Sequence, residues 1–112
     1  MKILHYTLKK KWFDMEMSGE KSEEYREITP YWQRRLTHFG EYIAEVNGIY
    51  MGTEPRVFDA VKARNGYGKN VPTFIRECLG INVGIGNPEW GAPDYPVFII
   101  KLGKLVNNDN NE

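Results

Sequence analysis

The chain has 112 residues, 41% hydrophobic and 27% charged, which is enough for one modest hydrophobic core. Its 15 Lys and Arg residues balance its 15 Asp and Glu residues. That balance argues against nonspecific duplex binding, which needs a basic surplus. No run of 18 apolar residues and no secretory signal is found, so we expect no membrane partner. The single cysteine, Cys78, fits a reducing compartment, and we expect a cytoplasmic protein.

The first part of the chain predicts a strand, a helix and a second strand. Alternating side chains predict a strand over Ile3 to Leu8, and apolar residues at helical spacing predict a helix over Lys9 to Ser18. Trp12 falls on the apolar stripe of this helix, so we expect it in the core. Gly19 stands where a left-handed helix end is expected. The chain should therefore turn at Gly19 into a charged strand, Ser22 to Ile28.

A second helix is predicted to begin at Thr29-Pro30, a capping residue followed by proline. Its apolar stripe contains Trp32, which the spacing places in the core, and Gly40 is expected to end it. The next segment, Glu41 to Pro55, gives no clear pattern, and we interpret it as an excursion from the main fold.

From Arg56 onward the pattern is that of short strands rich in β-branched and aromatic residues. Gly80 is expected to bend one long strand, and the run Val97 to Ile100 is apolar on both faces, which predicts a central strand. We expect a disordered polar tail over residues 107–112 and a single domain over residues 1–106. Helices come early and strands late, so the predicted fold class is α+β. The predicted late strands are Val57–Arg64, Thr73–Leu79, Ile81–Ile85 and Val97–Leu102.

The strongest functional signal is the charged stretch that follows Gly19. Alternate side chains of a strand share a face, so Glu24 and Arg26 should lie together, and Lys21 should reach them if the chain bends. An acid between two cations fixes their positions and leaves donors for a phosphate, a carbonyl or a base edge. The alternative interpretation is a solvated edge strand whose charges prevent edge-to-edge pairing.

Gly19, Lys21, Glu24 and Arg26 are in register with the Gly-x-Lys-x-x-Glu-x-Arg signature of ASCH domains, which are relatives of the PUA domain. The chain resembles the small stand-alone bacterial and phage members. This resemblance implies a small PUA-like, mostly antiparallel β-barrel flanked by two short helices. It also implies a pocket lined by Lys21, Glu24 and Arg26 that binds RNA or a modified nucleoside. On that view Lys21→Ala should abolish ligand binding and leave the melting temperature nearly unchanged.

Two later segments carry the same resemblance, which covers roughly Lys2 to Val106. They are Phe58 to Tyr67 and the loop Asn87 to Ala92.

The family also includes ribonucleases and amidohydrolases that act on acylated cytidines. A small metal-independent hydrolase is therefore an alternative, with Lys21 as its base and Glu24 as a second catalytic residue. The amidohydrolases have a nucleophilic hydroxyl where this chain has Glu24, which counts against the same acyl chemistry. His5 and His38 lack ligand spacing with Cys78, so we expect no metal and no cofactor. A protein-interaction adaptor is a third alternative.

Three further residues are candidate ligand contacts: Arg64, Tyr67 and Trp90. Arg64 and Tyr67 belong to a glycine-containing loop that resembles a weak phosphate cradle, or else a plain hairpin turn. Trp90 could stack on an unpaired base or plug one end of the barrel. The run Lys9 to Lys11 is either a solvated helix start or a region that attracts a polyanion.

Overall fold

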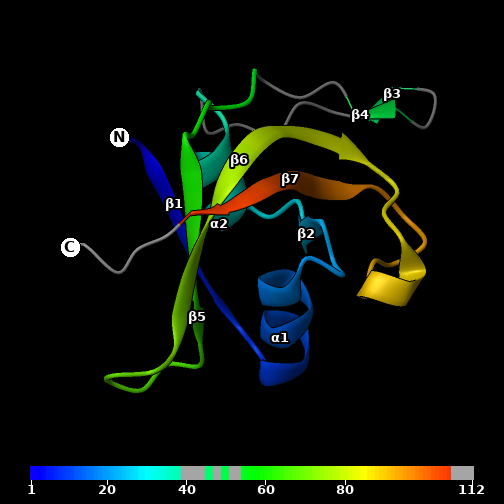
Figure 1. Ribbon diagram of the computed structural model, residues 1–112. Coiled ribbons are helices and arrows are strands. Elements are labelled where there is room, and N and C mark those ends of the chain that lie inside the picture. Colours follow the sequence, from blue (N-terminus) through cyan, green and yellow to red (C-terminus); the bar gives the residue numbers. More distant parts are fainter. Residues whose placement is uncertain (39–44, 47–48, 51–53, 107–112) are drawn as a thin grey trace. The chain divides into compact units, whose positions relative to one another are not determined.

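The computed structural model describes residues 1–38, 45–46, 49–50 and 54–106 (Figure 1). Short helices and a larger set of strands make up this part of the chain, so the predicted α+β class is confirmed. None of the described helices is long and apolar enough to cross a membrane. The elements are β1 (Ile3–Leu8), α1 (Lys10–Ser18), β2 (Glu23–Arg26), α2 (Pro30–Leu36), β3 (Glu45–Val46), β4 (Ile49–Tyr50), β5 (Ala60–Asn65), β6 (Thr73–Gly84), a 3₁₀ helix η1 (Pro88–Trp90) and β7 (Val97–Val106).

The main sheet has five strands in the order β1-β5-β6-β7-β2, and β3 pairs with β4 separately. β1 and β5 are parallel, with Leu8 opposite Asn65, whereas β5 and β6 are antiparallel. The sheet is mixed, because it contains both a parallel pair and an antiparallel pair of strands. Its order has two edges, β1 and β2, so hydrogen bonds among the described strands do not close the predicted barrel.

β6 and β7 also run in opposite directions. Gly103 of β7 lies beside Glu77 and Leu79 of β6, while Gly84 lies beside Ile99. The two strands predicted on either side of Gly80 are one strand, β6. Gly80 has a φ of 145°, which L side chains rarely adopt, so glycine lets the strand pass through this position.

The described residues form two compact units, and β6, β7 and β2 each contribute residues to both. Of the described residues, the first unit contains Met1–Glu24, Phe58–Gly80 and residues 101–106. Within it α1 packs against β1 and β5 (Figure 1). The rings of Phe13 and Phe74 lie 5.1 Å apart, and burial of such aromatic side chains is a large part of the stabilisation of a small core.

The end of α1 turns the chain toward β2. Gly19 has a φ of 89°, the left-handed conformation predicted for it, and its N–H binds the carbonyl oxygen of Glu16 at 3.3 Å. The N–H of Lys21 then binds the carbonyl of Met15 at 2.9 Å. Arg76 from β6 donates to the carbonyls of Glu16 and Met17, at 2.7 and 3.1 Å, so the last carbonyls of α1 have partners.

The second unit contains Tyr25–Val57 and Ile81–Ile100. Its helix α2 begins as predicted, because the Thr29 hydroxyl accepts a hydrogen bond from the N–H of Trp32 at 3.3 Å. The helix ends at Leu36, earlier than expected, since Thr37 is extended and pairs with Pro55. The predicted end at Gly40 lies outside the described residues. All four residues from Val97 to Ile100 are buried, which confirms the central position predicted for β7.

Gly86 allows a close approach within the second unit. A Cβ at this position would overlap the ring of Tyr25 and lie 2.8 Å from Ala92 Cβ. We expect Gly86→Ala to lower the free energy of unfolding by about 1–3 kcal/mol, because packed side chains would have to move. Gly68→Ala is the matched control, since its nearest neighbour, Val71, is 3.4 Å away. Equal denaturant midpoints for the two variants would contradict the prediction.

Candidate functional site

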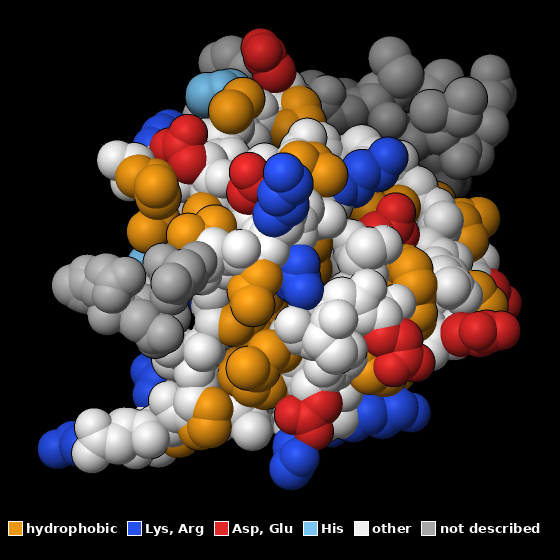
Figure 2. Space-filling model, viewed as in Figure 1, with side chains coloured by type: hydrophobic (Ala, Val, Ile, Leu, Met, Phe, Trp, Pro, Cys, Tyr) orange, Lys and Arg blue, Asp and Glu red, His pale blue; other side chains and the backbone are white. Residues whose placement is uncertain are grey.

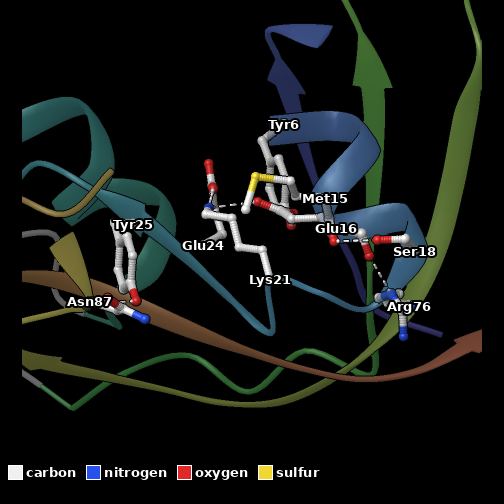
Figure 3. Close-up of polar contacts among 9 residues, drawn as sticks. All are labelled: Tyr6, Met15, Glu16, Ser18, Lys21, Glu24, Tyr25, Arg76 and Asn87. Carbon is white, nitrogen blue, oxygen red and sulfur yellow. Dashed lines mark hydrogen bonds and ion pairs between the residues drawn. The ribbon is translucent and has the colours of Figure 1, made fainter. Parts of the chain in front are cut away.

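Four polar side chains meet inside the first unit, and we call them the ion cluster: Tyr6, Glu16, Lys21 and Glu24 (Figure 3). They come from β1, α1, the turn after α1, and β2. Lys21 Nζ lies 3.0 Å from Glu16 Oε2 and 2.9 Å from Glu24 Oε1. The Tyr6 hydroxyl donates to Glu16 Oε1 at 2.9 Å. One ammonium is thus shared by two carboxyl groups.

The ion cluster is almost fully enclosed. Only 2% of Lys21, 4% of Glu24 and 0% of Glu16 is exposed. Burial, together with the charge and hydrogen bonding of nearby Glu24, raises the pKa of Glu16 to about 9, although Lys21 acts to lower it. Glu16 therefore holds a proton at neutral pH. A neutral Glu16 leaves one ammonium against one carboxylate, which avoids burying a net charge.

The structure confirms part of the sequence-based geometry. Lys21 does reach Glu24, as predicted from a bend after Gly19. The sequence did not lead us to predict that Glu16 and Tyr6 belong to this cluster. Glu16 lies three residues after the buried Phe13 on the same face of α1, and that spacing was the available signal.

A pocket of about 370 Å³ adjoins the turn after α1 in the first unit. Arg76 contributes a guanidinium, although its N–H groups already bind three backbone carbonyls, those of Glu16, Met17 and Gly103. Lys104 adds a second, exposed cation. The pocket is thus positively charged and next to the predicted motif. It is lined by Gly19, Lys21, Ser22, Arg76, Leu102, Gly103 and Lys104.

Arg26 belongs to a different pocket, of about 460 Å³, in the second unit. Its guanidinium carbon lies 4.8 Å from the centre of the Trp32 ring, and the Tyr31 ring meets Trp32 edge-on at 5.1 Å. Glu27 accepts a hydrogen bond from the Tyr95 hydroxyl at 2.8 Å. We call this site the aromatic pocket, and it is lined by Tyr25, Arg26, Glu27, Thr29, Tyr31, Trp32, Gly91, Pro93 and Val97.

Two tryptophans predicted in the core are only half-buried. On α2 the buried residues are Gln33 and Leu36, while Trp32 lies against Arg26 and Arg35. On α1, Phe13 faces the core instead of Trp12.

Trp12 carries the ammonium groups of Lys11 and Lys21 over its ring, at 4.6 and 5.4 Å. The core prediction was wrong for both tryptophans because their rings cover charged side chains rather than apolar ones.

The remaining predicted contacts lie at turns. Arg64 is the next-to-last residue of β5, and its guanidinium donates to the carbonyl of Gly68, so it holds the β5–β6 turn together. Tyr67, at the tip of that turn, is 89% exposed. Trp90 is half-buried at the end of η1, where the Asn87 side chain caps the N–H of Glu89 at 2.9 Å. That loop therefore contains a short 3₁₀ helix, and the ligand contact predicted for Trp90 stays a prediction.

Among the described residues, no three His, Cys, Asp or Glu side chains are grouped to hold a metal ion. Comparisons with protein-family models, with curated proteins and with solved structures found no match for this chain. The resemblance to ASCH domains therefore remains a prediction from the motif.

Proposed function

We propose that this protein binds RNA or a modified nucleoside and holds one base in the aromatic pocket. The observation that carries the proposal is the placement of the Arg26 guanidinium over Trp32, beside Tyr31. Unpaired bases are recognised by stacking on aromatic rings and on Arg planes. The pocket volume of about 460 Å³ lies within the range of small-molecule sites.

The charges of the pocket suit a nucleotide. Arg26 supplies donors for a phosphate or a base carbonyl. The Glu27 carboxylate, positioned by Tyr95, can accept a hydrogen bond from an exocyclic amine. In this proposal Arg26 is the residue of the ASCH-like motif that touches ligand. Lys21 and Glu24 act as buried support in the first unit, which differs from the lining role expected for them.

Calorimetric titration tests the proposal with the four nucleoside 5′-monophosphates, N4-acetylcytidine and a single-stranded RNA 12-mer. We expect Arg26→Lys to weaken binding about tenfold, because lysine keeps the charge but loses the planar contact with Trp32. Trp32→Leu should weaken it by roughly 5- to 100-fold.

Arg34→Lys is the matched control. Arg34 is exposed on α2, the helix that also contains Trp32, and it does not line the aromatic pocket. The proposal is wrong if no probe binds, or if Arg26→Lys and Trp32→Leu bind as tightly as Arg34→Lys does.

A second candidate function is a metal-independent hydrolase with Lys21 as base. One observation favours it: Lys21 and Ser22 line the pocket of the first unit beside Arg76. Clusters of buried ionisable groups with a shifted pKa also occur in active sites. Against it, the Lys21 side chain is 2% exposed, so a substrate reaches Nζ only if neighbouring side chains move. Mass spectrometry of RNA and acylated nucleosides after incubation decides the matter, because unchanged substrates contradict a hydrolase.

A further inference from the structure

A second group of charged residues in the first unit shares no member with the ion cluster. Parallel pairing of β1 with β5 places Leu8 opposite Asn65, and the N–H of Gly66 binds the carbonyl of Leu8 at 3.0 Å. The start of α1 and the β5–β6 turn therefore share one end of this unit. We call it the basic end, and it comprises Lys9, Lys10, Lys11, Arg64, Tyr67 and Lys69.

The lysines and the tyrosine of the basic end are open to solvent, whereas Arg64 is half-buried. All four lysines are exposed, and Tyr67 is 89% exposed. Figure 2 shows Lys and Arg side chains at separate places along the lower edge of the view, where the start of α1 and the tip of the β5–β6 turn lie in Figure 1. Asp14 offsets only part of this charge, through its ion pair with Lys10 at 2.6 Å.

Helix stability does not account for the three lysines at the start of α1, Lys9 to Lys11. The N-terminus of a helix carries a partial positive charge, so cations there are unfavourable. Lys9 occupies the N-cap without a side-chain hydrogen bond, and the first turn of α1 contains no acidic residue. In the pair with Asp14 the cation comes first, which is the less favourable order along a helix. Proteins tend to break such local preferences at functional or strained sites.

We propose that the basic end binds the backbone of single-stranded nucleic acid, with the lysines on phosphates and Tyr67 stacked on a base. A positive surface combined with an exposed aromatic ring is the arrangement that binds single strands without sequence preference. The turn around Tyr67 is otherwise small and polar, with Gly66, Gly68, Lys69 and Asn70, so it lacks the apolar face needed to enter a membrane. This inference rests on the proposed function and specifies its ligand as a polynucleotide rather than a free nucleoside.

The test is the salt dependence of binding to a fluorescent single-stranded RNA 12-mer. The triple variant Lys9→Gln, Lys11→Gln, Lys69→Gln should reduce the slope of log K against log salt by about 2, which is roughly 0.7 for each lysine that no longer neutralises a phosphate. Tyr67→Ala should weaken binding by roughly 5- to 100-fold at every salt concentration. All four residues are exposed, so we expect both variants to fold.

The matched control changes three exposed lysines elsewhere in the same unit: Lys2→Gln, Lys101→Gln and Lys104→Gln. Equal slopes for the two triple variants would overturn the inference, because net charge alone would then explain the effect. RNA binding no tighter than that of a mononucleotide would also overturn it. The inference would also be overturned if the lysines were needed for binding to anionic phospholipid vesicles but not for binding to RNA.

The two proposals fail in different ways. Suppose that mononucleotide binding depends on Arg26, while RNA binding is unchanged by the variants of the basic end. The proposed function then stands, and the inference about the basic end is wrong. Loss of any dependence on Arg26 and Trp32 removes the proposed function, whatever the salt slope.

Discussion

Lys21→Ala should lower the free energy of unfolding by about 3–5 kcal/mol, measured by denaturant unfolding at pH 7. The Lys21 ammonium lies within 3.0 Å of two enclosed carboxyl groups, and removing it leaves Glu24 buried without that counter-ion. The apolar stem of the lysine is removed as well, which adds a cavity. This replaces the expectation from the sequence that the melting temperature would hardly change, because that expectation treated Lys21 as an accessible ligand contact.

Two controls separate the ion pair from general damage. Lys10→Ala breaks an exposed pair with Asp14 and should cost well under ~1 kcal/mol. The double variant Lys21→Met, Glu24→Gln contains no unpaired carboxylate at position 24, so it should be more stable than Lys21→Met alone. If Lys21→Ala unfolds at the same denaturant concentration as Lys10→Ala, the ion cluster does not stabilise the first unit.

The local turns of this fold were predictable because single residues determine them. Gly19 ends α1 in a left-handed conformation, Thr29 caps α2, and Gly80 lets β6 pass through a φ of 145°. Each of these depends on backbone preferences that a short sequence segment contains. The pairing of β1 with β5 was not predicted, since parallel pairing joins segments far apart in the chain and leaves no local pattern.

The candidate site was predicted less completely for a related reason. α1 carries apolar residues around much of its circumference, so the sequence does not determine which face turns inward. The structure buries Phe13 and Glu16, whereas Trp12 is only half-buried. Lys21 and Glu24 were identified from their spacing, whereas the buried acid that shares the lysine depends on how α1 packs against β1 and β5.

The shifted pKa of Glu16 makes stability depend on pH. In the unfolded chain Glu16 releases its proton near the ordinary value of 4.5, whereas the folded chain holds it up to about 9. Between these values folding takes up a proton, so a rise in pH favours the unfolded chain. The contribution of Glu16 is thus fully present below about pH 4.5 and is lost as the pH rises toward 9. Between these two pKa values, the contribution of Glu16 to the free energy of unfolding falls by up to about 1.4 kcal/mol per pH unit.

Glu16→Gln isolates this contribution, because the amide stays neutral at every pH while it can still accept from the Tyr6 hydroxyl. Denaturant unfolding of both proteins from pH 5 to pH 9 gives the difference in stability, wild type minus variant. We expect that difference to fall steadily as the pH rises. Its value at pH 5 is not part of the prediction, because the substitution also alters the interaction with Lys21 and so changes the stability difference by the same amount at every pH. A difference that is constant over this range would mean that Glu16 is ionised in the folded protein. Lys21 would then be shared by two carboxylates, and the enclosed cluster would carry a net negative charge.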